Sequence, residues 1–174
     1  MRVMVGIDES DESFHALRWT LDKLFDGMST RTAAPEEANQ EEAGNLLTLL
    51  HVQKAFHNYG IPVGAGASAF YVPYSIEESV RKSQNQISKE LLFHASQMCK
   101  DKSIKVKSLI LEGDPKEKIC QVIEQMQVDL LVVGSRKLGK IKRSRALLGS
   151  VSDYCAHNAN CPVLIVKPPQ EASK

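Results

Sequence analysis

The residues best suited to bind a ligand lie between two apolar runs near the carboxyl end of the sequence. The first run, residues 130–133, is long enough for a buried strand and stops at Gly134. A basic, glycine-containing stretch follows, and a helix-like segment begins after Gly149 and Ser150. Backbone N–H groups at a helix start are unpaired, and the helix dipole favours an anion there. The pattern predicts a phosphate-binding loop, although ordinary turn and cap residues of a strand–helix unit would give the same spacing.

The stretch between the glycines is strongly basic. Residues 136–145 carry six Lys or Arg side chains in ten positions. Three interpretations stay open: a solvated loop, attraction of phosphate to the neighbouring helix start, and a nuclear-localisation or nucleic-acid patch. No aromatic residue interleaves with the basic ones, which argues against a surface that stacks single-stranded nucleic acid. Ser144, which has basic neighbours, is a candidate for phosphorylation.

The sequence contains no arrangement that predicts catalysis. The five histidines show no metal-ligand spacing, and the four cysteines, at 99, 120, 155 and 161, form no Cys-x-x-Cys pair. No Ser-His-Asp or paired-carboxylate pattern is present either. His51 lies at a strand end near the proposed ligand site, where a packed or hydrogen-bonded role is the simpler interpretation. We therefore predict neither catalytic residues nor metal ligands, and at most weak metal-dependent hydrolysis.

Composition favours a single globular domain. The 174 residues are 43% hydrophobic, and a chain of this length buries about 70% of its unfolded surface. The net charge of +1 makes nucleic acid an improbable general partner, and no segment has the roughly 18 consecutive apolar residues of a membrane span. We expect a reduced, cytoplasmic protein, with nuclear presence as an alternative. The expected domain covers residues 1–168, with a polar insertion at 28–45, an irregular connection at 53–74 and a tail at 169–174.

Apolar periodicity predicts alternating strands and helices. Capping patterns place helix starts at Ser10, at Ser75 with Glu78 three residues on, and at Asp114 before Pro115; Gly27 should end the first helix. The second helix should bury one face, and the fourth should cover residues 151–158. This β-α-β-α-β-α-β-α-β order predicts a mostly parallel five-stranded sheet with helices on both faces. The expected strands are residues 2–7, 46–52, 105–111, 130–133 and 163–166, and the expected buried face of the second helix is Ile76, Val80, Ile87, Leu91, Ala95 and Met98.

Topology brings three separate parts of the chain to one site. Ligands of open α/β sheets bind beyond the carboxyl ends of the strands, where the strand order reverses. That rule gathers Ile7-Asp8, Val52-Gln53 and the stretch from Gly134 onward. Asp8 also suits a role in capping the first helix, and the two roles are compatible.

Four segments resemble the universal stress protein family, in particular its plant single-domain branch. They are VGIDES (5–10), LLHVQ (49–53), GDPKEKIC (113–120) and the stretch VVGSR…IKR…LLGSVSDYCAHNANCPVLIVK (132–167). The resemblance implies a Rossmann-like, adenine nucleotide alpha hydrolase-like, doubly wound fold that dimerises through its last strand. It also implies ATP or AMP as the ligand, bound with or without Mg. The residues that would then contact the nucleotide are Ile7, Asp8, Val52, Gly134, Ser135, Arg136, Gly139, Gly149, Ser150, Val151 and Ser152.

The glycine loop departs from the family's Gly-x-x-Gly-x9-Gly-Ser/Thr motif. Lys137 stands where the second glycine belongs, and nine residues separate Gly139 from Gly149. If Gly139 takes the second position, the first gap is two residues too long, which adds up to about 7 Å of chain. Two functions follow as hypotheses. The first is a dimeric nucleotide-sensing module of stress signalling; the second is a member that has lost nucleotide binding and acts by dimerisation or chaperone-like contacts. Nucleotide hydrolysis or transfer is a third hypothesis.

Overall fold

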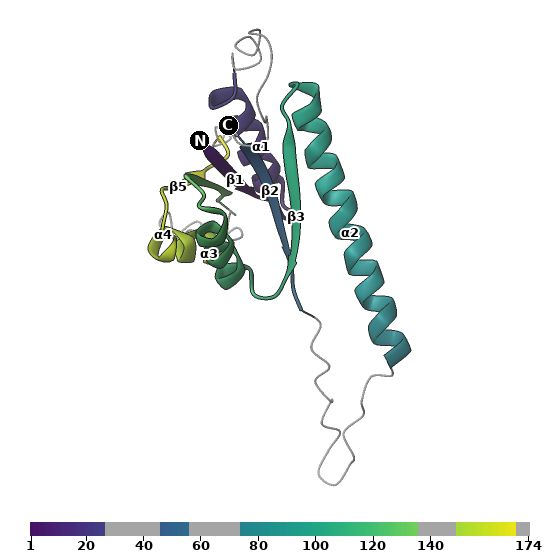
Figure 1. Ribbon diagram of the computed structural model, residues 1–174. Helices are drawn as coiled ribbons and strands as arrows, with labels where there is room; N and C mark the ends of the chain where they lie inside the picture. The colour runs from purple at the N-terminus through teal and green to yellow at the C-terminus, as the bar shows by residue number, and fades with distance from the viewer. Residues whose placement is uncertain (27–45, 56–73, 136–148, 170–174) are drawn as a thin grey trace, which may run out of the picture.

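A five-stranded parallel sheet forms the centre of the computed structural model, which describes residues 1–26, 46–55, 74–135 and 149–169 (Figure 1). The strands lie in the order β3-β2-β1-β4-β5, so the order reverses between β1 and β4. The prediction of a mostly parallel sheet with helices on both faces is confirmed. The strands are β1 (Arg2–Gly6), β2 (Leu46–Gln53), β3 (Val106–Glu112), β4 (Leu130–Gly134) and β5 (Val163–Val166).

Four helices among the described residues cover the sheet, two on each face. On the first face, two helices pack around a core that contains Val5, Leu17 and Leu92. On the second face, the other two helices pack around a core that contains Met4, Ile123 and Leu131. The strands are apolar on both sides because each face is covered. On the first face lie α1 (Asp11–Lys23), against β4 and β5, and α2 (Tyr74–Asp101), against β2 and β3; on the second lie α3 (Pro115–Met126) and α4 (Ser150–Asn158).

The ends of several elements differ from the sequence-based expectation. Helix α1 ends at Lys23, with Leu24 as its C-cap, so the expectation that Gly27 ends it is wrong. Ser75 lies inside α2 rather than at its cap, because the helix already begins at Tyr74. Helix α4 begins one residue earlier than predicted, at Ser150. Residues 28–45, 56–73 and 170–174 of the predicted insertion, connection and tail lie outside the described residues, while Gln53 is the last residue of β2.

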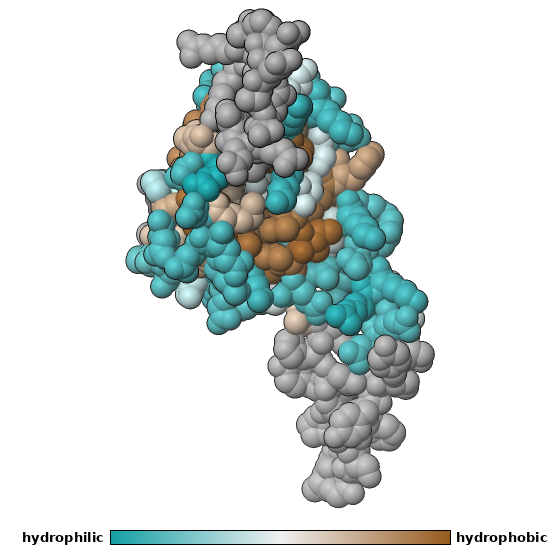
Figure 2. All heavy atoms as spheres, in the orientation of Figure 1, coloured by the Kyte–Doolittle hydropathy of each residue, from teal (hydrophilic) through white to brown (hydrophobic). Residues whose placement is uncertain are grey.

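The predicted buried face of α2 is confirmed in its carboxyl-terminal half, where Ala95 is buried and Leu91 and Met98 pack against the core, and is wrong at Ile76 and Ile87. Ile76 and Ile87 are each 52% exposed, whereas the buried side chains of α2 are Ser88, Leu92, Ala95 and Cys99. Figure 1 shows why, because α2 continues well past the end of the sheet. In Figure 2 the outward surfaces of the helices are mostly hydrophilic, and apolar atoms gather on the sheet between α3 and α2. None of the described helices is both long and apolar enough to cross a membrane.

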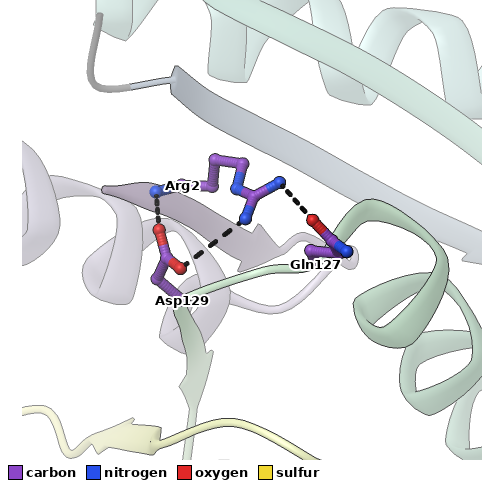
Figure 3. Close-up of polar contacts among 3 residues, drawn as sticks. All are labelled: Arg2, Gln127 and Asp129. Carbon is purple, nitrogen blue, oxygen red and sulfur yellow. Dashed lines mark hydrogen bonds and ion pairs between the residues drawn. The ribbon is translucent and has the colours of Figure 1, made fainter. Parts of the chain in front are cut away.

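Polar contacts tie the start of β1 to the connection between α3 and β4 (Figure 3). The backbone N–H of Arg2 donates to Asp129 Oδ2 at 2.6 Å, and the N–H of Asp129 donates to the Arg2 carbonyl at 2.9 Å. The Arg2 guanidinium donates to Gln127 Oε1 at 3.3 Å. Its ion pair with Asp129 spans 3.9 Å between half-exposed side chains, so that pair adds little to the stability. The backbone bonds fix the register at this end of the sheet.

The last residue of β4, Gly134, lies directly against the first turn of α1. A Cβ at Gly134 would lie 2.5 Å from the carbonyl oxygen of Glu12 and 2.9 Å from the backbone nitrogen of Ser13. Both neighbours are backbone atoms of a helix, so neither can rotate away as a side chain would. Gly134 therefore lets α1 approach the carboxyl end of β4, a packing role that exists whether or not the residue also meets a ligand.

We predict that Gly134→Ala lowers the free energy of unfolding by about 2–3 kcal/mol, because the new methyl group forces helix backbone away from the sheet. The measurement is urea denaturation followed by circular dichroism. Gly6→Ala is the matched control, since the nearest atom to a Cβ there is a Val133 methyl group at 3.4 Å, an ordinary contact. Equal stability losses in the two variants would contradict the close approach at Gly134.

Candidate functional site

The main cavity of the described residues lies at the carboxyl edge of the sheet. Its volume is about 610 Å³, within the usual range for small-molecule sites. Residues that follow β1, β2 and β4 meet there, at the point where the strand order reverses between β1 and β4. This is the place where open α/β sheets bind ligands. Its walls also include the starts of α1, α3 and α4 and part of α2.

The start of α1 has a side-chain cap. Ser10 is the N-cap, and its Oγ accepts the backbone N–H of Ser13 at 3.3 Å. Asp8 Oδ1 accepts the N–H of Ser10 at 3.0 Å and also contacts the Ser10 hydroxyl. The Ser13 hydroxyl donates to the Asp8 carbonyl at 2.8 Å. Asp8 thus has the capping role that the sequence allowed for, while it also lines the cavity.

The start of α3 is closed in the same way. Asp114 is the N-cap, as predicted, and its Oδ1 accepts the N–H of Lys116 at 2.8 Å. Gly113, which has a φ of 143°, donates its N–H to the carbonyl of Gln53 at 3.0 Å, so the turn before α3 is fixed to the end of β2. An L-residue rarely adopts this φ, so the turn needs glycine. Asp114, Pro115 and Lys116 line the cavity.

The start of α4 is different, because its N-cap is Gly149, which has no side chain with which to cap. The Ser152 hydroxyl does not fill that role, since it donates to the Gly149 carbonyl at 2.9 Å instead of accepting a backbone N–H. Ser150, Val151 and Ser152 line the cavity. Of the three helix starts at this site, α4 is the one whose first-turn N–H groups receive no cap from its own N-cap residue. Such a start attracts anions.

The structure places most of the predicted site residues in the wall of the cavity. Gly149 adjoins the cavity as the N-cap of α4. Ser135 is buried and follows Gly134, but it does not line the cavity. Arg136 and Gly139 lie outside the described residues, as do Lys137, Ser144 and the rest of the basic run. Those predicted residues that do line the cavity are Ile7, Asp8, Val52, Gly134, Ser150, Val151 and Ser152.

Sequence reasoning missed the wall that α2 and α3 supply. Asp114 follows the carboxyl end of β3, so the same strand-end rule that selected Asp8 would have found it. Ile87 and Ser88 come from the middle of α2, where no sequence signal marks them as cavity residues. His51, predicted to be packed or hydrogen-bonded, is buried, and its Nδ1 lies 2.8 Å from the Ile7 carbonyl oxygen.

The cysteines near α4 show no sign of a reactive thiol. Cys155 is fully buried, and burial, with Cys120 close by, raises its pKa to about 12. Burial likewise raises the pKa of Cys161. Thiols with raised pKa values stay protonated near neutral pH and are poor nucleophiles. Within the described part of the chain, no group of three or more His, Cys, Asp or Glu residues is arranged to hold a metal ion.

Comparisons with known proteins identify the family. A profile described as the universal stress protein family matches residues 1–167. Universal stress protein PHOS32 of Arabidopsis thaliana is 28% identical over 181 residues, and the alignment covers 98% of this chain but just under two thirds, 66%, of that protein. A universal stress protein A-like protein of the same plant is 28% identical over 152 residues, with 87% of this chain and 76% of that protein covered.

Solved structures agree with the sequence comparisons. A universal stress protein family protein from Arabidopsis thaliana, crystallised with AMP bound, superposes with a TM-score of 0.65 at 25% sequence identity. The match covers 97% of this chain and 92% of that structure. The five-stranded Rossmann-like architecture is thus shared over nearly the full length of both chains. The family match, the fold and the position of the cavity lead to one conclusion: this chain belongs to the universal stress protein family.

Proposed function

We propose that this chain binds an adenine mononucleotide, AMP or ATP, in the cavity at the carboxyl edge of the sheet and acts as a nucleotide-sensing module in stress signalling. The observation that carries the proposal is the start of α4, where Gly149 leaves the first-turn N–H groups without a side-chain cap inside the cavity. A phosphate group is a suitable acceptor for those donors. The AMP bound by the Arabidopsis relative supports the choice of nucleotide.

The capping pattern supports one orientation of the ligand. Ser10 and Asp114 already occupy N–H groups at the starts of α1 and α3, so these ends attract an anion less than α4 does. The phosphate therefore belongs at Ser150–Ser152, and the base at the far wall near Val52. Nucleotide occupancy would then stabilise the first turn of α4 and the chain that leads into it, which is a local change that a partner protein can detect.

Binding without catalysis is the simplest form of this function. The described residues around the cavity offer two lysines, Lys54 and Lys116, and three carboxylates, Asp8, Glu9 and Asp114. Asp8 and Asp114 already accept backbone N–H groups, so their carboxylates are arranged for capping. Mg binding and slow hydrolysis stay outside the proposal, whose central element is reversible occupancy of the site.

We predict that Ser150→Glu lowers the affinity for AMP roughly 5- to 150-fold at low ionic strength, because a carboxylate at the start of α4 repels the phosphate by roughly 1–3 kcal/mol. The substitution should leave the fold intact, since a negative charge at a helix N-terminus stabilises the helix. Isothermal titration calorimetry of nucleotide-free protein with AMP measures the change.

Two controls separate charge from shape in that experiment. Ser150→Gln has nearly the same size as the glutamate variant without its charge, and should bind AMP much more tightly than Ser150→Glu. Adenosine has no phosphate, so its affinity should be equal in both variants. Wild-type protein that is folded but does not bind AMP would contradict the proposal and favour a family member that has lost nucleotide binding.

We also infer a dimer through β5. This strand is at the edge of the sheet, paired with β4 on one side, and carries the apolar sequence Val163–Val166. An open apolar edge is prone to pair with another chain. We expect light scattering at micromolar concentration to give twice the 19.3 kDa chain mass. A wild-type monomer would contradict the dimer.

A further inference from the structure

A polar pair joins two walls of the cavity that are far apart in sequence. Gln53 is the last residue of β2, and Ser88 lies in the middle of α2; both line the cavity. The Ser88 hydroxyl lies 3.0 Å from Gln53 Oε1 and 2.9 Å from the Gln84 carbonyl oxygen. The side chain of Ser88 is only 2% exposed and occupies the same helix face as Leu92, Ala95 and Cys99. A hydroxyl on this otherwise apolar face is costly unless it is hydrogen-bonded.

The Ser88 hydroxyl has two hydrogen-bond acceptors within reach. A serine hydroxyl carries one hydrogen, and both of its close contacts are with oxygen atoms. The hydroxyl proton is therefore shared between an acceptor within α2, the Gln84 carbonyl oxygen, and an acceptor on β2, Gln53 Oε1. The backbone of Gln53 is held as well, because its carbonyl accepts the N–H of Gly113 at 3.0 Å. Ser88 therefore holds one end of the Gln53 amide against α2.

A fixed amide at a cavity wall can identify a base. An amide oxygen has two lone pairs, so Gln53 Oε1 can accept from Ser88 and still accept a second hydrogen bond, while Nε2 has two hydrogens to donate. Glutamine pairs in a bidentate way with the N6 and N7 atoms of adenine. Guanine presents two acceptors, O6 and N7, at the same edge, so one of its atoms faces the amide oxygen unfavourably.

We propose that Gln53, positioned by Ser88, is the specificity-determining residue that selects an adenine base over a guanine base in this cavity. The inference rests on the nucleotide site of the proposed function and adds to it a side chain that discriminates between bases. The neighbours of the pair fit this role, since Val52 and the 52% exposed Ile87 line the cavity beside it and offer apolar surface to the plane of a base.

The test compares AMP, GMP and ribose 5-phosphate by isothermal titration calorimetry of the full chain. Wild-type protein should prefer AMP to GMP by roughly 5- to 150-fold, the range of one good bidentate pair. Gln53→Leu should bring that ratio close to one and weaken AMP binding by a similar factor. Its affinity for ribose 5-phosphate, which lacks a base, should match that of the wild type.

Ser88→Ala tests the positioning role. It removes one hydroxyl without adding bulk, and we expect the AMP preference over GMP to fall about threefold or more because the amide of Gln53 is then free to rotate. Ser96→Ala is the matched control, since Ser96 is also on α2 and contacts a strand side chain, Ser108 Oγ at 3.1 Å, outside this cavity. It should leave the ratio unchanged. A loss of ribose 5-phosphate affinity in Ser88→Ala or Gln53→Leu would show a structural effect and overturn the inference.

The remaining outcomes distinguish this inference from the function on which it rests. If wild-type protein binds AMP and Ser150→Glu weakens it, but Gln53→Leu keeps the wild-type AMP to GMP ratio, the role of Gln53 is wrong and the nucleotide site stands. If folded wild-type protein binds neither AMP nor ribose 5-phosphate, both fail. If wild-type protein binds AMP and GMP equally, the site stands and Gln53 selects no base.

Discussion

The close approach of α1 to the end of β4 is the contact on which the carboxyl edge of this protein depends. It is possible because Gly134 has no Cβ, which would otherwise lie 2.5 Å from the Glu12 carbonyl oxygen. With α1 held there, the turn from Asp8 to Ser13 lies beside the end of β4, and the Ser13 hydroxyl binds the Asp8 carbonyl. One wall of the cavity is thus set by backbone packing. A methyl group added at Gly134 would therefore displace α1, whether or not a ligand is bound.

Once the helices are in place, their caps give the cavity its polarity. Ser10 and Asp114 use their side chains on the first turns of α1 and α3, whereas Gly149 has none to use on α4. The three helix starts point to the same space, yet their attraction for an anion differs. The opposite wall, where Gln53 contacts Ser88, borders apolar residues and carries one charged side chain, Lys54. A molecule with a phosphate at one end and a flat polar base at the other matches this division.

Local signals in the sequence predicted two of the three proposed side-chain caps and failed at Ser75. Ser10 and Asp114 were identified as caps because a cap depends on residues within one turn. Gly149 and Ser150 marked a helix start for the same reason. The strand-end rule then brought Ile7, Val52 and Gly134 to one edge, where the structure also places them. The role of Gly134 in packing was not predictable, because the atoms that crowd it belong to α1, more than a hundred residues away in sequence.

Helix α2 shows where periodicity fails. Its 28 residues extend about 42 Å, but the seven-residue strand β3 beside it spans only about 23 Å. The amino-terminal part of α2 has no sheet to cover, so Ile76 stays exposed, while Ile87 lines the cavity and does not pack in the core, although both fit an apolar pattern. Ser88, a polar residue, takes a buried position because Gln53 is its partner across 35 residues. The apolar pattern of a single helix gives no information about the length of the sheet or about a partner residue on a strand.

The most direct test of the central claim is a backbone amide spectrum of ¹⁵N-labelled protein during titration with AMP. If the phosphate binds at the start of α4, the amides of Ser150, Val151 and Ser152 should shift most, because their N–H groups meet the phosphate. The amide of Lys116 should shift less, since it already donates to Asp114. Shifts confined to other parts of the chain, or an unchanged spectrum of folded protein at saturating AMP, would contradict the account.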